Sequence, residues 1–151
     1  MLLLSADLLR KLGKLPCFAE VEHDLTPLHD VDVSRGDRIV FISHRWWQPD
    51  SPDGASAEKV ALVLSLLEAH IQPHKPGGRI YLWWDFASIT QKTHALHHAC
   101  DKGAQILAIP FYLVAVDAMI VLDGGDAEAY AAGGEAAGVE WCKAGFDLRG
   151  C

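Results

Sequence analysis

The fold is decided by one short stretch, Arg38-Ile39-Val40-Phe41-Ile42-Ser43. It is a continuous apolar run rich in β-branched residues, which is typical of a strand buried on both faces of a parallel sheet. Two similar runs follow it, Arg79–Asp85 and Ala118–Leu122. Because helical patterns separate the three runs, the order strand, helix, strand, helix, strand predicts an α/β fold. The expected sheet is parallel, with right-handed crossovers and flanking helices.

The segments between the predicted strands carry the helical patterns. We expect a helix from about Ala57 to Ile71, capped by Ser56 and ended by prolines and glycines. A second helical stretch covers about Thr93 to Ala108. Pro110 breaks it and suits the first turn of a further short helix, Phe111–Val116.

The chain before the first strand has a different character. Leucines at helical spacing predict an amphipathic helix over Leu2–Leu12, and the mixed polar stretch Pro16–Arg35 predicts an irregular connection. We therefore expect residues 1–36 to be an N-terminal helix and lead-in, and residues 37–151 to be the α/β domain.

Composition limits the function. The chain has 151 residues, 50% hydrophobic and 22% charged, which suits one domain with a buried core. A net charge of −7 argues against nucleic acid and anionic membrane surfaces as partners. No segment reaches the roughly 18 apolar residues of a membrane span. The four cysteines are far apart, which favours free thiols in a reducing compartment, so we expect a cytoplasmic protein. We also expect no bound cofactor.

Polar side chains gather where the first two strands end. Ser43, His44, Arg45 and Trp46 follow the first strand, and Asp85 ends the second. Because ligands bind beyond the carboxyl ends of open parallel sheets, we expect these residues to bind a ligand. The arginine can hold a phosphate or carboxylate through two hydrogen bonds, and the tryptophan can stack on a ring. The aspartate can accept hydrogen bonds from ribose hydroxyls. It can equally form a structural ion pair with the arginine, and we expect those two side chains to be close.

Two other clusters carry weaker signals. His94 and His98 share one helix face, but Cys100 points away from it and no carboxylate completes a metal site. Asp50 and Asp53 lack the alternating ligands of a calcium loop. We therefore expect a polar helix surface, a solvated turn and no metal.

Several motifs, in this order, resemble a known family. Phe41–Trp46 is followed by Pro49-Asp50, then by Trp84-Asp85 with its loop to Gln91, and much later by Trp141-Cys142-Lys143. This order resembles a divergent group of Toll/interleukin-1 receptor (TIR) like domains, over about residues 37–143. The resemblance implies a flavodoxin-like parallel sheet. Some relatives cleave NAD at the bond between nicotinamide and ribose, and others signal by self-association.

The chain departs from that family at one informative position. In the enzymes a glutamate follows the Trp-Cys pair by about three residues, and here that position is Gly145. Glycine cannot stabilise a developing cationic sugar, so the resemblance implies a catalytically impaired, nucleotide-recognising or signalling domain. Two alternatives stay open: an active NAD glycohydrolase that uses Glu135 or Glu140, and a structural protein-interaction module. The chain also ends before the last elements of such a fold, so we expect it to be incomplete at its C-terminus.

Overall fold

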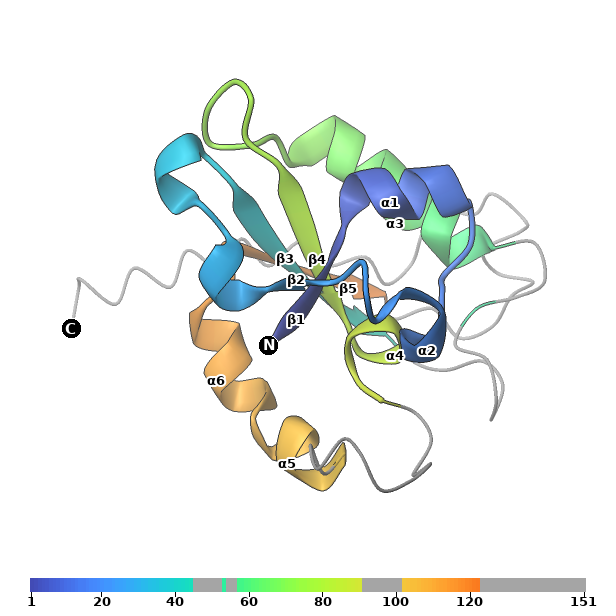
Figure 1. Ribbon diagram of the computed structural model, residues 1–151. Coiled ribbons are helices and arrows are strands. Elements are labelled where there is room, and N and C mark those ends of the chain that lie inside the picture. The colour runs from blue at the N-terminus through green and yellow to red at the C-terminus, as the bar shows by residue number, and fades with distance from the viewer. Residues whose placement is uncertain (45–52, 54–56, 91–101, 123–151) are drawn as a thin grey trace.

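The computed structural model describes residues 1–44, 53, 57–90 and 102–122, and these form an α/β structure (Figure 1). Its centre is one mixed, five-stranded sheet in the order β2-β1-β4-β3-β5. The strands are β1 (Leu2–Ser5), β2 (Thr26–Pro27), β3 (Arg38–His44), β4 (Ile80–Trp84) and β5 (Ala118–Leu122). The helices are α1 (Ala6–Leu12), α2 (Phe18–Val21), α3 (Glu58–His70), α4 (Asp85–Ser88), α5 (Lys102–Leu107) and α6 (Ile109–Val114), with short 3-10 turns at Leu28–Asp30 and Val33–Arg35.

The three parallel strands confirm the central prediction. β3 lies between β4 and β5 and is parallel to both, with Phe41 opposite Trp83 on one side and Met119 on the other. β5 has the predicted bounds, and β3 extends one residue further, to His44. α3 matches the predicted helix after the first strand. The beginning of the predicted second helix lies outside the described residues, and α5 is its end.

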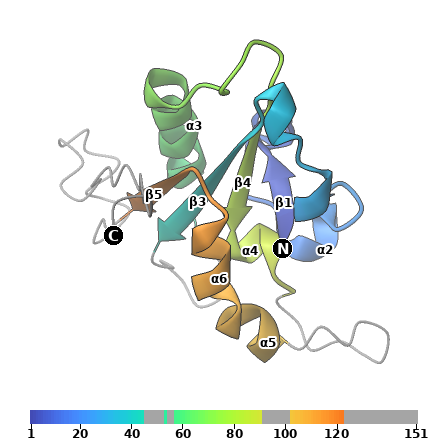
Figure 2. The same cartoon turned by 90° about the vertical axis from the view of Figure 1, so that its left-hand side faces the viewer.

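The helices cover both faces of the sheet (Figure 2). Val40 and Ile42 of β3 belong to the core cluster that contains α1 and α3. Ile39 and Phe41 belong to a second cluster, against which α6 packs. This division follows from the strand itself, because successive side chains point to opposite faces. None of the helices in the described part of the chain has the length and apolar character that a membrane span requires.

The prediction of one helix over Leu2–Leu12 is wrong in its first turn. Residues Leu2–Ser5 form β1, which is antiparallel to both β2 and β4, so the sheet is mixed rather than all parallel. Leu3 and Leu4 are both fully buried, and they belong to different core clusters. A strand can bury consecutive leucines on two faces, whereas an amphipathic helix buries one stripe. Helix α1 begins only at Ala6. Ser5, which precedes it, caps the helix, because its hydroxyl accepts a hydrogen bond from Leu8 N.

Gly36 forms a tight turn before β3 that leaves no room for a side chain. Gly36 has φ of +96°, and a Cβ atom there would lie 2.5 Å from the backbone nitrogen of Lys75. We expect Gly36→Ala to lower the free energy of unfolding by about 3 kcal/mol, from left-handed strain plus overpacking. Gly13 is the matched control, since its φ is +64° but no atom lies within 4 Å of the added Cβ. Gly13→Ala should cost only about 1 kcal/mol. Urea denaturation of both variants measures the difference, and equal losses would contradict the steric argument.

Candidate functional site

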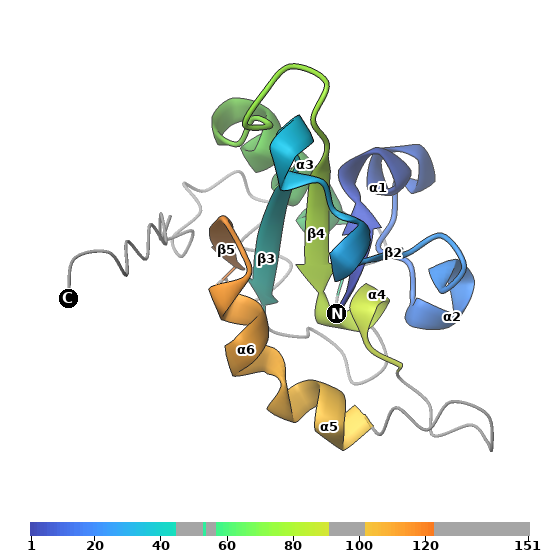
Figure 3. The same cartoon turned by 60° about the vertical axis from the view of Figure 1, so that its left-hand side comes forward.

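The carboxyl ends of β3 and β4 bring two predicted site residues together. His44 ends β3, Asp85 directly follows β4, and Figure 3 shows these two strand ends side by side. His44 Nε2 lies 2.8 Å from Asp85 Oδ1. The His44 side chain is 1% exposed, whereas the Asp85 side chain is 34% exposed. The histidine side chain is therefore buried, whereas the aspartate side chain is partly accessible from outside.

The surroundings of His44 restrict its ring. Trp84 meets the imidazole edge-on, with ring centroids 5.4 Å apart and planes at 86°. Asp85 Oδ1 also accepts a hydrogen bond from Phe86 N, at 2.6 Å. Among the residues that the structure describes, His44 Nδ1 is buried without a hydrogen-bond partner. The contact with Asp85 thus fixes the ring through Nε2, whereas Nδ1 has lost its contact with water and gained no hydrogen bond from the described residues in return.

Lys59 is a member of this site that the sequence analysis missed. It is 1% exposed and lies in the first turn of α3. Burial lowers the pKa of its amine to about 8, although the carboxylates of Asp53 and Asp85 act in the opposite direction. Helical periodicity could have found it, because Lys59, Val63 and Leu67 are spaced by four residues and all three are buried.

Asp53 corrects another expectation. We predicted a solvated turn there, but Asp53 is only 6% exposed. Its carboxylate accepts hydrogen bonds from the backbone nitrogens of Lys59, at 3.0 Å, and Val60, at 3.3 Å. The first amides of a helix lack internal partners and favour a negative charge, so Asp53 performs the capping that we had assigned to Ser56. Ser56 itself lies outside the described residues.

The remaining predicted site residues have different outcomes. Ser43 is next to His44 in β3, where it pairs with Val121 of β5. Because neighbouring strand residues point to opposite faces, Ser43 faces the side of α6, while His44 shares the α3 face with Trp84. The structure does not bring Ser43 and His44 into one cluster. Arg45 and Trp46 lie outside the described residues, so the predicted approach of Arg45 to Asp85 stays a prediction.

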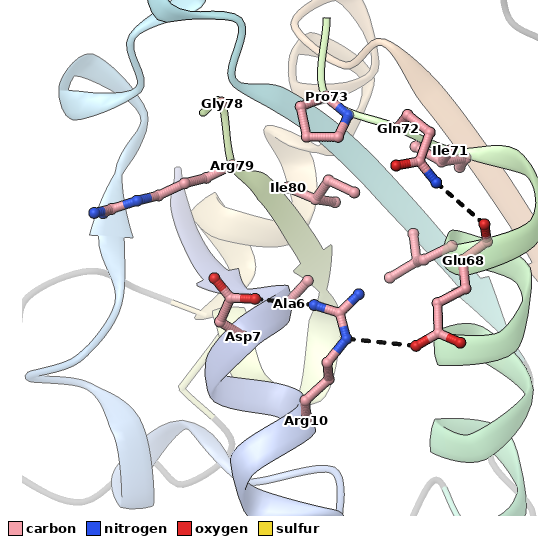
Figure 4. Close-up of a pocket in the computed structure, with 11 residues that line it drawn as sticks. Ala6, Asp7, Arg10, Glu68, Ile71, Gln72, Pro73, Gly78, Arg79 and Ile80 are labelled. Atoms are coloured by element: carbon pink, nitrogen blue, oxygen red, sulfur yellow. Dashed lines mark hydrogen bonds and ion pairs between the residues drawn. The ribbon is translucent and has the colours of Figure 1, made fainter. Parts of the chain in front are cut away.

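A separate cavity of about 230 Å³ lies at the opposite end of β4, between α1 and α3 (Figure 4). Arg10 crosses it, with Nη1 2.9 Å from Asp7 Oδ1 and Nε 3.8 Å from Glu68 Oε1. Both carboxylates are well exposed, and exposed ion pairs of this kind contribute little to stability or recognition. Substitutions at this cavity therefore provide a control for substitutions at His44 and Asp85, which lie at the other end of the sheet.

Most of the residues considered for metal or thiol chemistry lie outside the described part of the chain. No group of three or more His, Cys, Asp or Glu residues there is arranged to hold a metal ion. His94, His98 and Cys100 lie outside the described residues. Cys17 is a free thiol, as predicted.

Comparisons of the chain with protein-family models, curated proteins and solved structures found no match. The resemblance to TIR-like domains therefore stays a prediction from the motifs.

Proposed function

We propose that the chain is a TIR-like domain with a flavodoxin-like sheet, and that it recognises a nucleotide, NAD or a related dinucleotide. The ligand would lie beyond the carboxyl ends of β3 and β4. One observation carries the proposal: the pair of His44 and Asp85, with 2.8 Å between Nε2 and Oδ1, stands at this edge. Structural ion pairs are common, but this one includes a buried imidazole whose second nitrogen is unpartnered.

The topology supports this position. The parallel strands have the order β4-β3-β5, with α3 on one face and α6 on the other. After β3 the chain adds β4 on one side of β3, and it then crosses over to add β5 on the other side of β3. In open α/β sheets, ligands bind where the strand order reverses in this way, and the order matches the first three strands of a flavodoxin-like sheet.

The chemistry of the strand ends also suits a nucleotide. The partly exposed Asp85 carboxylate is able to accept hydrogen bonds from ribose hydroxyls. Arg45 would hold a phosphate, Trp46 would stack on a ring, and Ser43 would line the neighbouring strand end. Gly145 replaces the family's glutamate, so the proposed role is recognition or signalling rather than NAD cleavage.

Calorimetric titration of the full chain with NAD tests the proposal. We expect binding that Asp85→Ala weakens at least tenfold, since the variant removes the carboxylate from the strand end. Arg10→Ala is the control, because Arg10 lines the cavity at the opposite end of β4. It should leave the affinity unchanged within about twofold. Absence of NAD binding, or equal losses in the two variants, would reject the proposed site.

A second candidate function is self-association through α5 and α6. Leu107, at the end of α5, is 76% exposed, and Phe111 and Val114 of α6 are both 75% exposed. Phe111 and Val114 are three residues apart and so lie on one face of α6. Exposed apolar groups that cluster in this way are typical of protein-interaction surfaces. We expect light scattering to show a concentration-dependent dimer of the chain that Phe111→Ser abolishes. A monomer at all concentrations would exclude this second function.

A further inference from the structure

The two ring nitrogens of His44 are in different situations. Nε2 contacts Asp85 Oδ1 at 2.8 Å, while Nδ1 is buried and has no partner in the described part of the chain. The whole side chain is 1% exposed. Leaving a buried polar atom unpaired costs free energy, so such atoms in native proteins call for an explanation, and one explanation is a ligand that completes the hydrogen bonding.

Asp85 determines which nitrogen carries the hydrogen. Its Oδ1 accepts a hydrogen bond from Phe86 N at 2.6 Å, so this oxygen acts as an acceptor. An ionised carboxylate has no hydrogen to donate, and Nε2 must therefore donate to it. A neutral imidazole has one N–H group, which leaves a lone pair on Nδ1. The edge-on contact with Trp84 opposes a flip of the ring that would exchange the two nitrogens.

We propose that Asp85 holds His44 in the Nε2–H tautomer, so that Nδ1 accepts a hydrogen bond from an N–H or O–H group of the bound nucleotide. This inference rests on the proposed function and specifies its chemistry. In NAD the donor is the nicotinamide carboxamide, the adenine amino group or a ribose hydroxyl. A site that offers a buried acceptor discriminates against an analogue that lacks the donor, because the acceptor then stays unpaired.

The first test needs no ligand. Nitrogen-15 NMR of the free protein should show His44 with hydrogen on Nε2 and none on Nδ1, and Asp85→Ala should weaken this preference. Saturating NAD should then move the Nδ1 signal of His44. His74 provides the internal reference, since its Nε2 lies 3.0 Å from Asp117 Oδ1 and its side chain is 42% exposed. Its signals should not respond to NAD, because Asp117 immediately precedes β5 and so lies at the other end of the sheet.

Two substitutions separate the roles of the two nitrogens. Glutamine places its amide near the position of Nε2, and asparagine places its amide near that of Nδ1. We expect His44→Gln to lose NAD affinity at least tenfold and His44→Asn to retain more of it, because only asparagine offers an acceptor at the Nδ1 position. His74→Gln should bind NAD like the unmodified chain. Circular dichroism of each variant verifies that the fold is intact.

Two analogues identify the donor. If the carboxamide donates, the deamido analogue of NAD, which carries a carboxylate instead, should bind at least tenfold more weakly and leave Nδ1 unmoved. If a ribose hydroxyl or the adenine amino group donates, ADP-ribose should move the Nδ1 signal as NAD does. Hydrogen on Nδ1 in the free protein, or an unmoved Nδ1 signal with bound NAD, would overturn the inference alone. Absence of NAD binding would instead reject the proposed function, and the ligand contact with it.

Discussion

Replacing Lys59 by methionine should raise the free energy of unfolding at pH 7, although the substitution removes a charge from a polar site. The ordinary pKa of the lysine amine is 10.5, and in the folded chain it is about 8. This difference means that folding disfavours the charged amine by about 3 kcal/mol. Methionine has a similar length and carries no charge to bury. Asp53 and Asp85 keep backbone hydrogen-bond donors, so the loss of the amine does not leave them unpaired.

The pH dependence has a definite sign. Between pH 8 and 10.5 the unfolded chain binds more protons at Lys59 than the folded chain, so the stability of the unmodified protein rises with pH. The advantage of Lys59→Met should therefore be as large as about 3 kcal/mol at pH 7 and should shrink steadily above pH 8. Denaturant titrations at pH 7 and pH 9.5 measure it.

An exposed lysine provides the control for this experiment. Lys11 is exposed at the end of α1, and Lys11→Met should change stability by less than about 0.5 kcal/mol at either pH. If Lys59→Met lowered stability at pH 7, the attraction between the amine and its two carboxylates would outweigh its burial. A gain in stability would instead mean that the chain keeps a costly cation near Asp53 and Asp85. Such a trade of stability for chemistry is typical of functional sites.

The unmodified chain should release no nicotinamide from NAD above the uncatalysed rate. Cleavage builds positive charge on the ribose, and an aligned carboxylate lowers that barrier. In the proposed TIR-like alignment, Gly145 takes the position of the glutamate, and it lies outside the described residues. Asp147 lies two residues further on and has a shorter side chain. Since a misplacement of about 1 Å can already cost roughly 100-fold, Asp147 is a poor substitute. Asp85, at the strand ends, is a poor substitute as well, because its Oδ1 is already in contact with His44 Nε2 and Phe86 N.

The Gly145→Glu variant tests the same argument in the other direction. We expect it to gain measurable NAD turnover, and Gly145→Gln, which has the same shape without the charge, to remain inactive. Release of nicotinamide is followed chromatographically with all three proteins at equal concentration. Clear turnover by the unmodified chain would contradict the impairment and favour the glycohydrolase alternative, in which Glu135 or Glu140 supplies the carboxylate.

The parts of the structure that could be predicted share a physical cause. β3 is buried on both faces, and β5 is buried on one face and half-buried on the other, so their apolar runs are continuous and distinctive. The meeting of His44 and Asp85 follows from this, because parallel neighbouring strands end at the same edge.

The parts that failed depend on contacts that the local sequence pattern does not encode. Leu2–Ser5 has a pattern that suits a helix, and pairing with β2 and β4 makes it a strand. The burial of Asp53 depends on its capping of α3, five residues further along the chain. A charged residue next to prolines gives no local sign of such burial. Lys59 differs from these residues, because its four-residue spacing from Val63 and Leu67 is a local sign of burial that its charge obscures.

The position of β1 has a consequence for how the chain is made. β1 lies between β2 and β4, and Leu4 pairs with Leu82. β1 is synthesised well before β4 and therefore waits for that strand before its pairing in the sheet is complete. Until then Leu4 lacks its partner Leu82, and such transiently exposed apolar segments are prone to aggregate. Because the fold completes the pairing of β1 late, yield in the cell should depend on chaperones that bind leucine-rich chain.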